Sequence, residues 1–136
     1  MTPVDLHTVG LAVVQNKKLL LAYSNNKHAW YLPGGKIDGN ETAVTALVRE
    51  VNEELGITLD VVQLKYYVHI TAPAYGEQQN MMMQQSCYTY PLTETINFGN
   101  EIGGVKYFTP DEYAREPAQV PGVIQLFKQL QSDQLI

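Results

Sequence analysis

Apolar side chains in the first half of the chain recur at the spacing of an amphipathic helix. Within residues 41–55 they fall at i, i+3, i+4, i+7 and i+11, which places them on one helical face; they are Val44, Leu47, Val48, Val51 and Leu55. Asn40 is a candidate N-cap, and Gly56 suits the left-handed position that ends a helix. The pattern therefore predicts a helix over residues 41–55, entered from a Pro-Gly-Gly turn at residues 33–35.

Short apolar runs bounded by turn residues predict the strands. The runs cover residues 7–14, 18–23, 30–32, 57–64, 66–71, 81–92 and 105–108. The first two runs are expected to pair as an antiparallel hairpin around a tight turn at residues 15–17. Polar loops are expected at residues 73–80 and 93–101.

Two further helices are predicted near the C-terminus. Thr109 can cap the first of them, with Pro110 at its first helical position. The second follows Pro121 over residues 123–131, where a core-facing apolar stripe comprises Val123, Leu126, Phe127 and Leu130. Antiparallel strands with three helical segments predict an α+β fold in helix, sheet and helix layers.

Length and charge narrow the classes of function. A chain of 136 residues predicts one domain over residues 1–136. The formal net charge is −5, which makes duplex nucleic acid a poor partner. No apolar run is long enough to span a membrane, and the N-terminus lacks a basic region followed by an apolar one, so we expect a cytoplasmic protein without membrane partners. The single cysteine, Cys87, excludes an internal disulfide and is expected to be a packed thiol.

The predicted helix carries an unusual concentration of negative charge. Glu50, Glu53 and Glu54 stand at i, i+3 and i+4 on a face adjacent to the apolar stripe. Like charges at these spacings each destabilise a helix by roughly 0.2–0.5 kcal/mol, so the cluster opposes folding unless a cation neutralises it. Mg²⁺ takes oxygen ligands and commonly completes its coordination shell with substrate phosphates. The cluster therefore indicates metal-dependent phosphate chemistry.

These residues belong to a longer pattern of nine restricted positions, which resembles the signature of the Nudix hydrolases throughout. The matching residues are Gly35, Glu41, Arg49, Glu50, Val51, Glu53, Glu54, Gly56 and Ile57. The resemblance covers 23 of the 136 residues, and a chance match of this length is very improbable. It implies the Nudix fold, an α/β/α sandwich of a mixed sheet that contains the loop–helix–loop of the signature.

The resemblance also implies roles for individual residues around a bound Mg²⁺ or Mn²⁺. The expected metal ligands are the backbone carbonyl of Gly34 and the side chains of Glu50, Glu53, Glu54 and Glu101. Glu101 is included because Nudix enzymes often add a glutamate from a late loop, a region that also contains Glu94. Arg49 is expected to orient a carboxylate, while Gly35 and Glu41 are expected to support the site without binding the metal.

The implied reaction is attack of water on a phosphorus of a diphosphate linkage. Glu50, Glu53 and Arg49 are the expected catalytic residues; Glu50 is the first candidate for the general base, followed by Glu53 and Glu101. A MutT-like nucleoside triphosphate pyrophosphatase is favoured. The alternatives are a hydrolase of ADP-ribose or dinucleoside polyphosphates and a non-catalytic module that senses nucleotides.

The substrate is expected to be a small nucleotide or a nucleoside diphosphate derivative. Trp30 precedes the glycine turn and could stack on a base, although an aromatic residue there is at least as often part of the core. Pro73 and Tyr75 stand near the spacings that mark ADP-ribose and dinucleoside polyphosphate subgroups, respectively, so they do not decide between these substrates. Tyr75 remains a candidate substrate contact. Many relatives are dimers, so a homodimer is a further possibility.

Overall fold

The computed structural model describes residues 4–77 and 81–136, and its central feature is a pair of four-stranded β-sheets. The first sheet has the strand order β5-β1-β7-β6. Its strands are β1 (Val4–Ala12), β5 (Gly34–Lys36), β6 (Lys65–Pro73) and β7 (Met81–Thr89). β1 and β7 are parallel, whereas the other two pairings are antiparallel. The predicted mixed sheet is therefore confirmed.

The second sheet is antiparallel and is built around β3. Its strands are β2 (Val14–Gln15), β3 (Lys18–Ser24), β4 (Ala29–Tyr31) and β8 (Ile102–Phe108). β2 and β4 pair with opposite ends of β3, and β8 pairs along most of its length.

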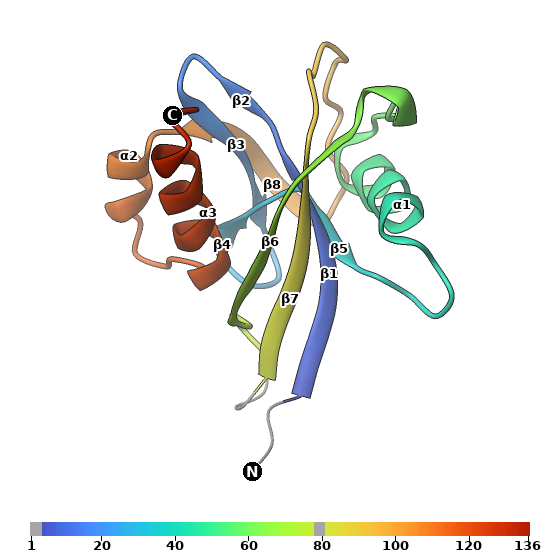
Figure 1. The fold of residues 1–136 in the computed structure, drawn as a ribbon, viewed down its shortest axis with the longest axis horizontal. Coiled ribbons are helices and arrows are strands. Elements are labelled where there is room, and N and C mark those ends of the chain that lie inside the picture. Colours follow the sequence, from blue (N-terminus) through green and yellow to red (C-terminus); the bar gives the residue numbers. More distant parts are fainter. Residues whose placement is uncertain (1–3, 78–80) are drawn as a thin grey trace.

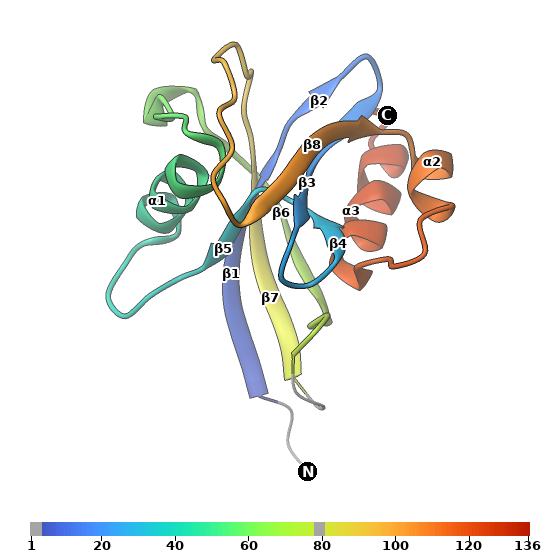
Figure 2. The same ribbon diagram turned by 180° about the vertical axis from the view of Figure 1, so that it is seen from behind.

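The helices lie on two sides of the sheets. They are α1 (Ala43–Leu55), α2 (Pro110–Ala114) and α3 (Pro121–Ser132), with a 3-10 turn, η1 (Val61–Gln63). Figure 1 shows α1 on one flank and α2 with α3 on the other, and the reverse view in Figure 2 shows the same arrangement. This layering confirms the predicted α+β sandwich. Within the described residues, no helix is long and apolar enough to cross a membrane.

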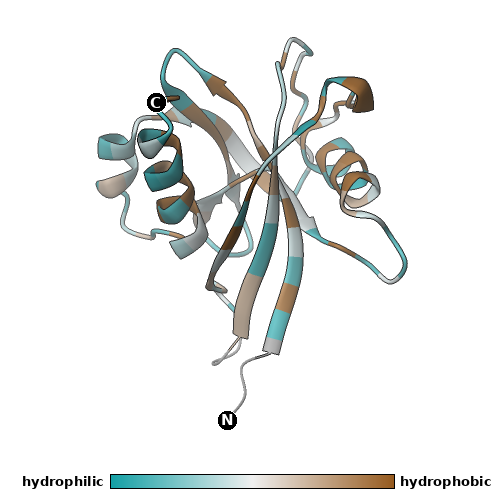
Figure 3. Cartoon of the chain, viewed as in Figure 1, coloured by the Kyte–Doolittle hydropathy of each residue, from teal (hydrophilic) through white to brown (hydrophobic). Residues whose placement is uncertain are grey.

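Four of the five residues in the predicted apolar stripe of α1 pack into the core, whereas Val44 does not belong to either apolar cluster. Leu47, Val51 and Leu55 are fully buried, and Figure 3 shows apolar residues recurring along this helix. The helix ends at Gly56, which adopts the left-handed conformation with φ = 66°. Its predicted start was wrong, because the N-cap is Thr42, whose side chain accepts a hydrogen bond from the backbone N–H of Thr45.

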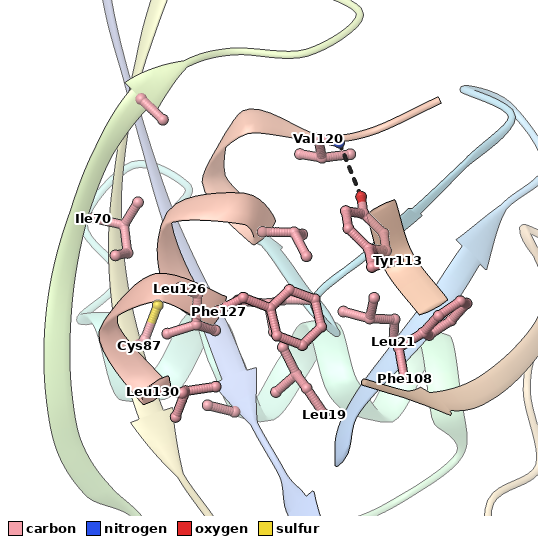
Figure 4. Close-up of a cluster of buried hydrophobic side chains, with 14 of the residues drawn as sticks. Leu19, Leu21, Ile70, Cys87, Phe108, Tyr113, Val120, Leu126, Phe127 and Leu130 are labelled. Atoms are coloured by element: carbon pink, nitrogen blue, oxygen red, sulfur yellow. Dashed lines mark hydrogen bonds between the residues drawn. The ribbon is translucent and has the colours of Figure 1, made fainter. Parts of the chain in front are cut away.

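Two apolar clusters form the core, one against each helical layer. Figure 4 shows the cluster beneath α3, where Phe108, Tyr113 and Phe127 pack together. The Tyr113 hydroxyl accepts a hydrogen bond from the N–H of Val120 at 2.9 Å and donates one to the carbonyl of Trp30 at 3.0 Å. These bonds tie the start of α3 to β4. Cys87 is fully buried in the same cluster, as expected for a packed thiol.

Three strand predictions need correction. Only the end of the run at residues 7–14 forms the predicted hairpin, where Val14 of β2 pairs with Leu19 of β3. The rest of the run is β1, which pairs with β5 and β7 before the chain crosses at Val13 into the second sheet. Residues 57–64 form a loop and η1, in which the Asp60 side chain accepts a hydrogen bond from the N–H of Val62. The strand predicted over residues 81–92 ends at Thr89, shortly before a proline that lacks a backbone donor. The last positions of the predicted loop at 73–80, residues 78–80, lie outside the described part of the chain.

Candidate active site

A cleft of about 650 Å³ lies between the two sheets. Its wall combines β5, the end of α1, the loop after β6 and the loop before β8. Gly34 and Gly35 belong to β5, so the turn predicted at residues 33–35 is largely strand. The lining includes Tyr31, Gly34, Lys36, Glu54, Tyr75 and Glu101. The cleft therefore brings together residues that are far apart in the sequence.

Glu54 and Glu101 form the acidic end of the cleft, and Glu54 is the more deeply buried of the two. Its Oε1 accepts a hydrogen bond from the backbone N–H of Gly34 at 2.9 Å. Gly34 has φ = 139°, and an added Cβ would lie 2.1 Å from the carbonyl oxygen of Val9, so only glycine fits at the start of β5. Burial, followed by the negative charges of Glu50, Glu101 and Glu53, raises the pKa of Glu54 to about 8 despite the Gly34 hydrogen bond.

Glu50 packs directly over Gly35. A Cβ added to Gly35 would lie 2.6–2.9 Å from the carboxylate atoms of Glu50, so the absence of a side chain makes room for this group. Burial raises the pKa of Glu50, and the adjacent Arg49 opposes that effect. The lack of a side chain at Gly35 therefore allows Glu50 to occupy this position.

Arg49 joins the acidic residues into one network. Its Nε and Nη2 form a two-pronged pair with Glu41 at 2.8 and 2.9 Å, and its Nη1 donates to Oε1 of Glu50 at 2.9 Å. Nη2 also donates to the carbonyl of Lys36 at 3.1 Å. Hydrogen bonds from Arg49, and then from the backbone of Asp38, lower the pKa of Glu41 to about 2. Glu41 thus fixes Arg49, and Arg49 in turn fixes Glu50.

The other predicted acidic residues occupy different positions. The Glu53 side chain is 59% exposed, and its Oε1 lies 3.5 Å from Nη1 of Arg49. Glu101 lines the cleft, and its charge contributes to the raised pKa of Glu54. Glu94 instead accepts hydrogen bonds from the Tyr90 hydroxyl and the Thr93 backbone. Of the two late-loop glutamates, the structure places only Glu101 beside Glu54.

The oxygen donors of these residues suit a divalent cation, although the residues do not enclose a complete coordination site. In the part of the chain that the structure describes, no three acidic, histidine or cysteine side chains converge as a ready metal centre. Arg49 pairs with both Glu50 and Glu53, which occupies two of the expected ligands. The crowding that raises the pKa of Glu54 is the electrostatic strain that a cation would relieve. An all-oxygen donor set suits Mg²⁺ or Mn²⁺.

The two predicted substrate contacts have different surroundings. Trp30 packs edge-on against Tyr23 and Phe108, with ring centroids 5.3 and 5.1 Å apart, and does not line the cleft. Tyr75 does line it, beside Tyr31, whose hydroxyl donates to the Tyr75 carbonyl at 3.2 Å. The geometry therefore favours Tyr75 over Trp30 as a substrate contact. The alternation of side chains along β4 could have indicated that Tyr31 faces opposite to Trp30.

Sequence reasoning also missed a charged cluster in the cleft wall. Oε1 of Glu77 lies 3.1 Å from Nζ of Lys36 and 3.4 Å from Nζ of Lys27. Hydrogen bonding to Lys36 is the main cause of the lowered pKa of Glu77. Lys27 also donates to the Tyr75 carbonyl at 3.4 Å, so the cluster holds the loop after β6 against the cleft.

A layered α+β fold with a glycine-containing strand and an acidic helix beside a cleft is the architecture of one family of hydrolases that cleave phosphoanhydrides. A family model described as the NUDIX domain matches residues 6–130. The chain belongs to the NUDIX family and is a Nudix hydrolase. Enzymes of this family generally use divalent metal ions.

Individual relatives agree with this assignment. The chain is 29% identical over 122 residues to a MutT-like protein of Streptomyces ambofaciens, covering 88% of this chain and 75% of that protein. Over 34 residues it is 56% identical to an 8-oxo-dGTP diphosphatase of Proteus vulgaris, covering 25% of this chain and 29% of that one. The crystal structure of a MutT protein from Methanosarcina mazei Go1 superimposes with a TM-score of 0.78 at 17% identity, covering 98% of each chain. That structural match confirms the fold predicted from the sequence.

Proposed function

We propose that this protein is a metal-dependent, MutT-like pyrophosphohydrolase that cleaves a nucleoside triphosphate into a nucleoside monophosphate and pyrophosphate. The observation that carries the proposal is the acidic end of the cleft. There, Glu54 is held by the N–H of Gly34 and crowded by Glu50 and Glu101. A nearby cation would stabilise the charged form of a carboxylate in this setting. A cation bound there would also lie where a polyphosphate can enter the cleft.

The protein residues bind, orient and exchange protons around that cation. Glu50, Glu53, Glu54 and Glu101, with the carbonyl of Gly34, would hold Mg²⁺ or Mn²⁺. The bound ion would supply charge neutralisation for the phosphate oxygens and a more acidic water. Arg49 keeps the Glu50 carboxylate in one orientation through the 2.9 Å hydrogen bond to its Oε1.

Glu50 remains the first candidate for the general base, ahead of Glu53 and Glu101. Its pKa is raised by burial, and a base works best when its pKa approaches the operating pH. Its position over Gly35 also keeps it beside the expected metal ligand Gly34. Glu53 is more exposed, which leaves its carboxylate less well oriented for proton transfer.

The choice of a nucleoside triphosphate rests on the relatives and on the charges of the cleft. The MutT-like protein and the 8-oxo-dGTP diphosphatase are the relatives that support it. Lys27 and Lys36 stand in the same cleft as the acidic end, where they can balance phosphate charge that the metal does not neutralise. ADP-ribose and dinucleoside polyphosphates remain the alternative substrates.

The test is hydrolysis of a substrate panel by the wild type and by Glu53→Gln and Glu54→Gln, with and without Mg²⁺. The panel comprises nucleoside triphosphates, ADP-ribose and dinucleoside polyphosphates. Each substitution should lower turnover by at least about a hundredfold, because it removes a metal ligand. The thermal midpoint of the metal-free protein should not fall, since each change relieves charge repulsion.

Glu116→Gln provides the matched control, because Glu116 lies beyond α2 and outside the cleft lining. Its turnover should equal that of the wild type. Unchanged hydrolysis in both Glu53→Gln and Glu54→Gln would contradict the proposed site. Preferred cleavage of ADP-ribose or a dinucleoside polyphosphate would replace the proposed substrate, whereas nucleotide binding without any turnover would identify a sensing module.

A further inference from the structure

A row of three polar side chains crosses the floor of the cleft. In the strand register, Thr8 of β1 lies opposite Lys36 of β5 on one side and opposite Gln85 of β7 on the other. All three residues line the cleft. Neighbouring strands are about 4.8 Å apart, so Gln85 lies roughly 10 Å from Lys36 along this row. The row therefore leads from β5 towards the start of α3.

The side chain of Gln85 fits between two glycines. A Cβ added to Gly10 would lie 3.1 Å from Nε2 of Gln85, and one added to Gly122 would lie 4.0 Å from its Oε1. The Gly10 site is therefore tight, and any larger residue there would press on the amide. The two amide atoms thus face different elements, with Nε2 over β1 and Oε1 towards α3.

The Gln85 amide has little to bind within the protein. Among the residues that the structure describes, its one hydrogen-bond partner is the thiol of Cys87, a weak donor 3.9 Å from Oε1. The surrounding cleft wall is largely apolar, formed by Leu6, Leu32, Met83 and Val120. Gln85 is only partly buried, so its amide is open to the cleft and available to pair with a ligand that displaces water there.

We propose that Gln85 contacts the N7 edge of the substrate's base and that the preferred base is adenine; this rests on the proposed function in taking the substrate to be a nucleotide. A glutamine amide offers one donor and one acceptor side by side. Adenine presents the complementary pair, the N7 acceptor and the N6 donor. On this edge guanine presents two acceptors, N7 and O6, so it pairs with both amide groups only if it turns its O6 and N1–H edge towards Gln85 instead.

The rest of the cleft agrees with this placement of the base. Tyr31 and Tyr75 lie in its wall with ring centroids 6.1 Å apart, and aromatic rings provide stacking surfaces for bases. With the base at Gln85, the phosphates extend back along the row towards Lys36 and the acidic end that contains Glu54. One nucleotide then uses both ends of the cleft.

The experiment measures equilibrium binding of the α,β-methylene analogues of ATP and GTP, which separates base selection from hydrolysis. The wild type should bind the ATP analogue about 5- to 150-fold more tightly, the range for one good bidentate contact to a base. Gln85→Met keeps a similar volume without the amide and should bring the ratio of the two dissociation constants close to one. Gln85→Glu keeps an acceptor but loses the donor to N7, so it should also weaken binding of the ATP analogue.

Gln84→Met is the matched control. Gln84 precedes Gln85 on β7 but faces the other side of the sheet, where its Oε1 contacts His69 and Thr71 at 2.7 and 2.8 Å. This variant should keep the wild-type ratio. Tighter binding of the GTP analogue by the wild type, or an unchanged ratio in both Gln85 variants, would overturn the inference. Selective binding of the ATP analogue without hydrolysis of ATP would overturn the proposed reaction and still support the role of Gln85.

Discussion

Arg49 shows how one residue can organise an acidic site. Its guanidinium contacts Glu41 and Glu50 through charge-assisted hydrogen bonds, lies within 3.5 Å of Glu53, and donates to the carbonyl of Lys36. A planar guanidinium can make these contacts at once, because its five donors point outward in a fixed fork. A lysine ammonium is a compact point charge with no such fork. The net charge of the site would be the same with either residue, but its geometry would differ.

Arg49→Lys should therefore reduce catalysis more than stability. We expect kcat/KM for the preferred nucleotide to fall by about 10- to 100-fold, the usual cost of losing a residue that orients metal ligands. Steady-state kinetics at saturating Mg²⁺ would measure the loss. Arg115→Lys is the control, because Arg115 is an exposed residue at the end of α2 and should keep wild-type kinetics. Equal kinetics in the two variants would show that the charge of Arg49 suffices and its fork does not matter.

At the scale of single residues, the sequence predicted the site residues that lie on one continuous segment of the chain. The contacts of Glu41, Arg49, Glu50 and Glu54 all arise within residues 34–55, so fixed spacings are enough to indicate them. Gln85 could not be found in this way. Its setting depends on glycines of β1 and α3 and on strand pairings between distant segments, which leave no local pattern.

At the scale of elements, local signals located α1 and the C-terminal helices. They did not locate the point where the chain passes from the first sheet to the second. The capping box at Thr109 and the left-handed Gly56 have clear chemical signatures, and both appear where expected. The apolar run at residues 7–14 is continuous, so it does not reveal that the chain changes sheets at Val13. Long-range packing determines which strands pair with a buried strand, and the alternation of apolar and polar residues along that strand does not encode this choice.

The start of α1 provides a direct test at this scale, because the sequence pointed to Asn40 and the structure to Thr42. Thr42→Ala removes the side-chain acceptor for the N–H of Thr45, so it should lower the free energy of unfolding by about 1 kcal/mol. Asn40→Ala should change it by less than about 0.5 kcal/mol, as is usual for exposed surface positions. Urea denaturation followed by circular dichroism would measure both. A larger loss for Asn40→Ala would place the cap two residues earlier.

At the scale of the whole molecule, the acidic end of the cleft opposes the stability of the metal-free protein. The pKa of Glu54 is raised from about 4.5 to about 8, chiefly by burial and then by neighbouring carboxylates. The folded state therefore holds the Glu54 proton at a pH where the unfolded state has lost it. This contribution to stability is fully present below about pH 4.5 and is lost as the pH rises through 8. Glu41 has the opposite shift, but its pKa of about 2 places its effect in more acidic solution.

The free energy of unfolding of the metal-free protein should thus decline between about pH 5 and pH 8, by an amount on the order of a few kcal/mol. Glu54→Gln carries no titrating proton and should flatten this decline, which urea titrations in a chelator at several pH values would reveal. Adding Mg²⁺ at pH 8 should restore stability to the wild type, because an ion that binds only the folded state stabilises it by mass action. Glu54→Gln should gain less from the ion, since it has lost a charged ligand. If the free energy of unfolding of the wild type depends on pH as little as that of the variant, Glu54 is already ionised at pH 5. Solvent, and not a bound cation, would then relieve the crowding of charge in the cleft.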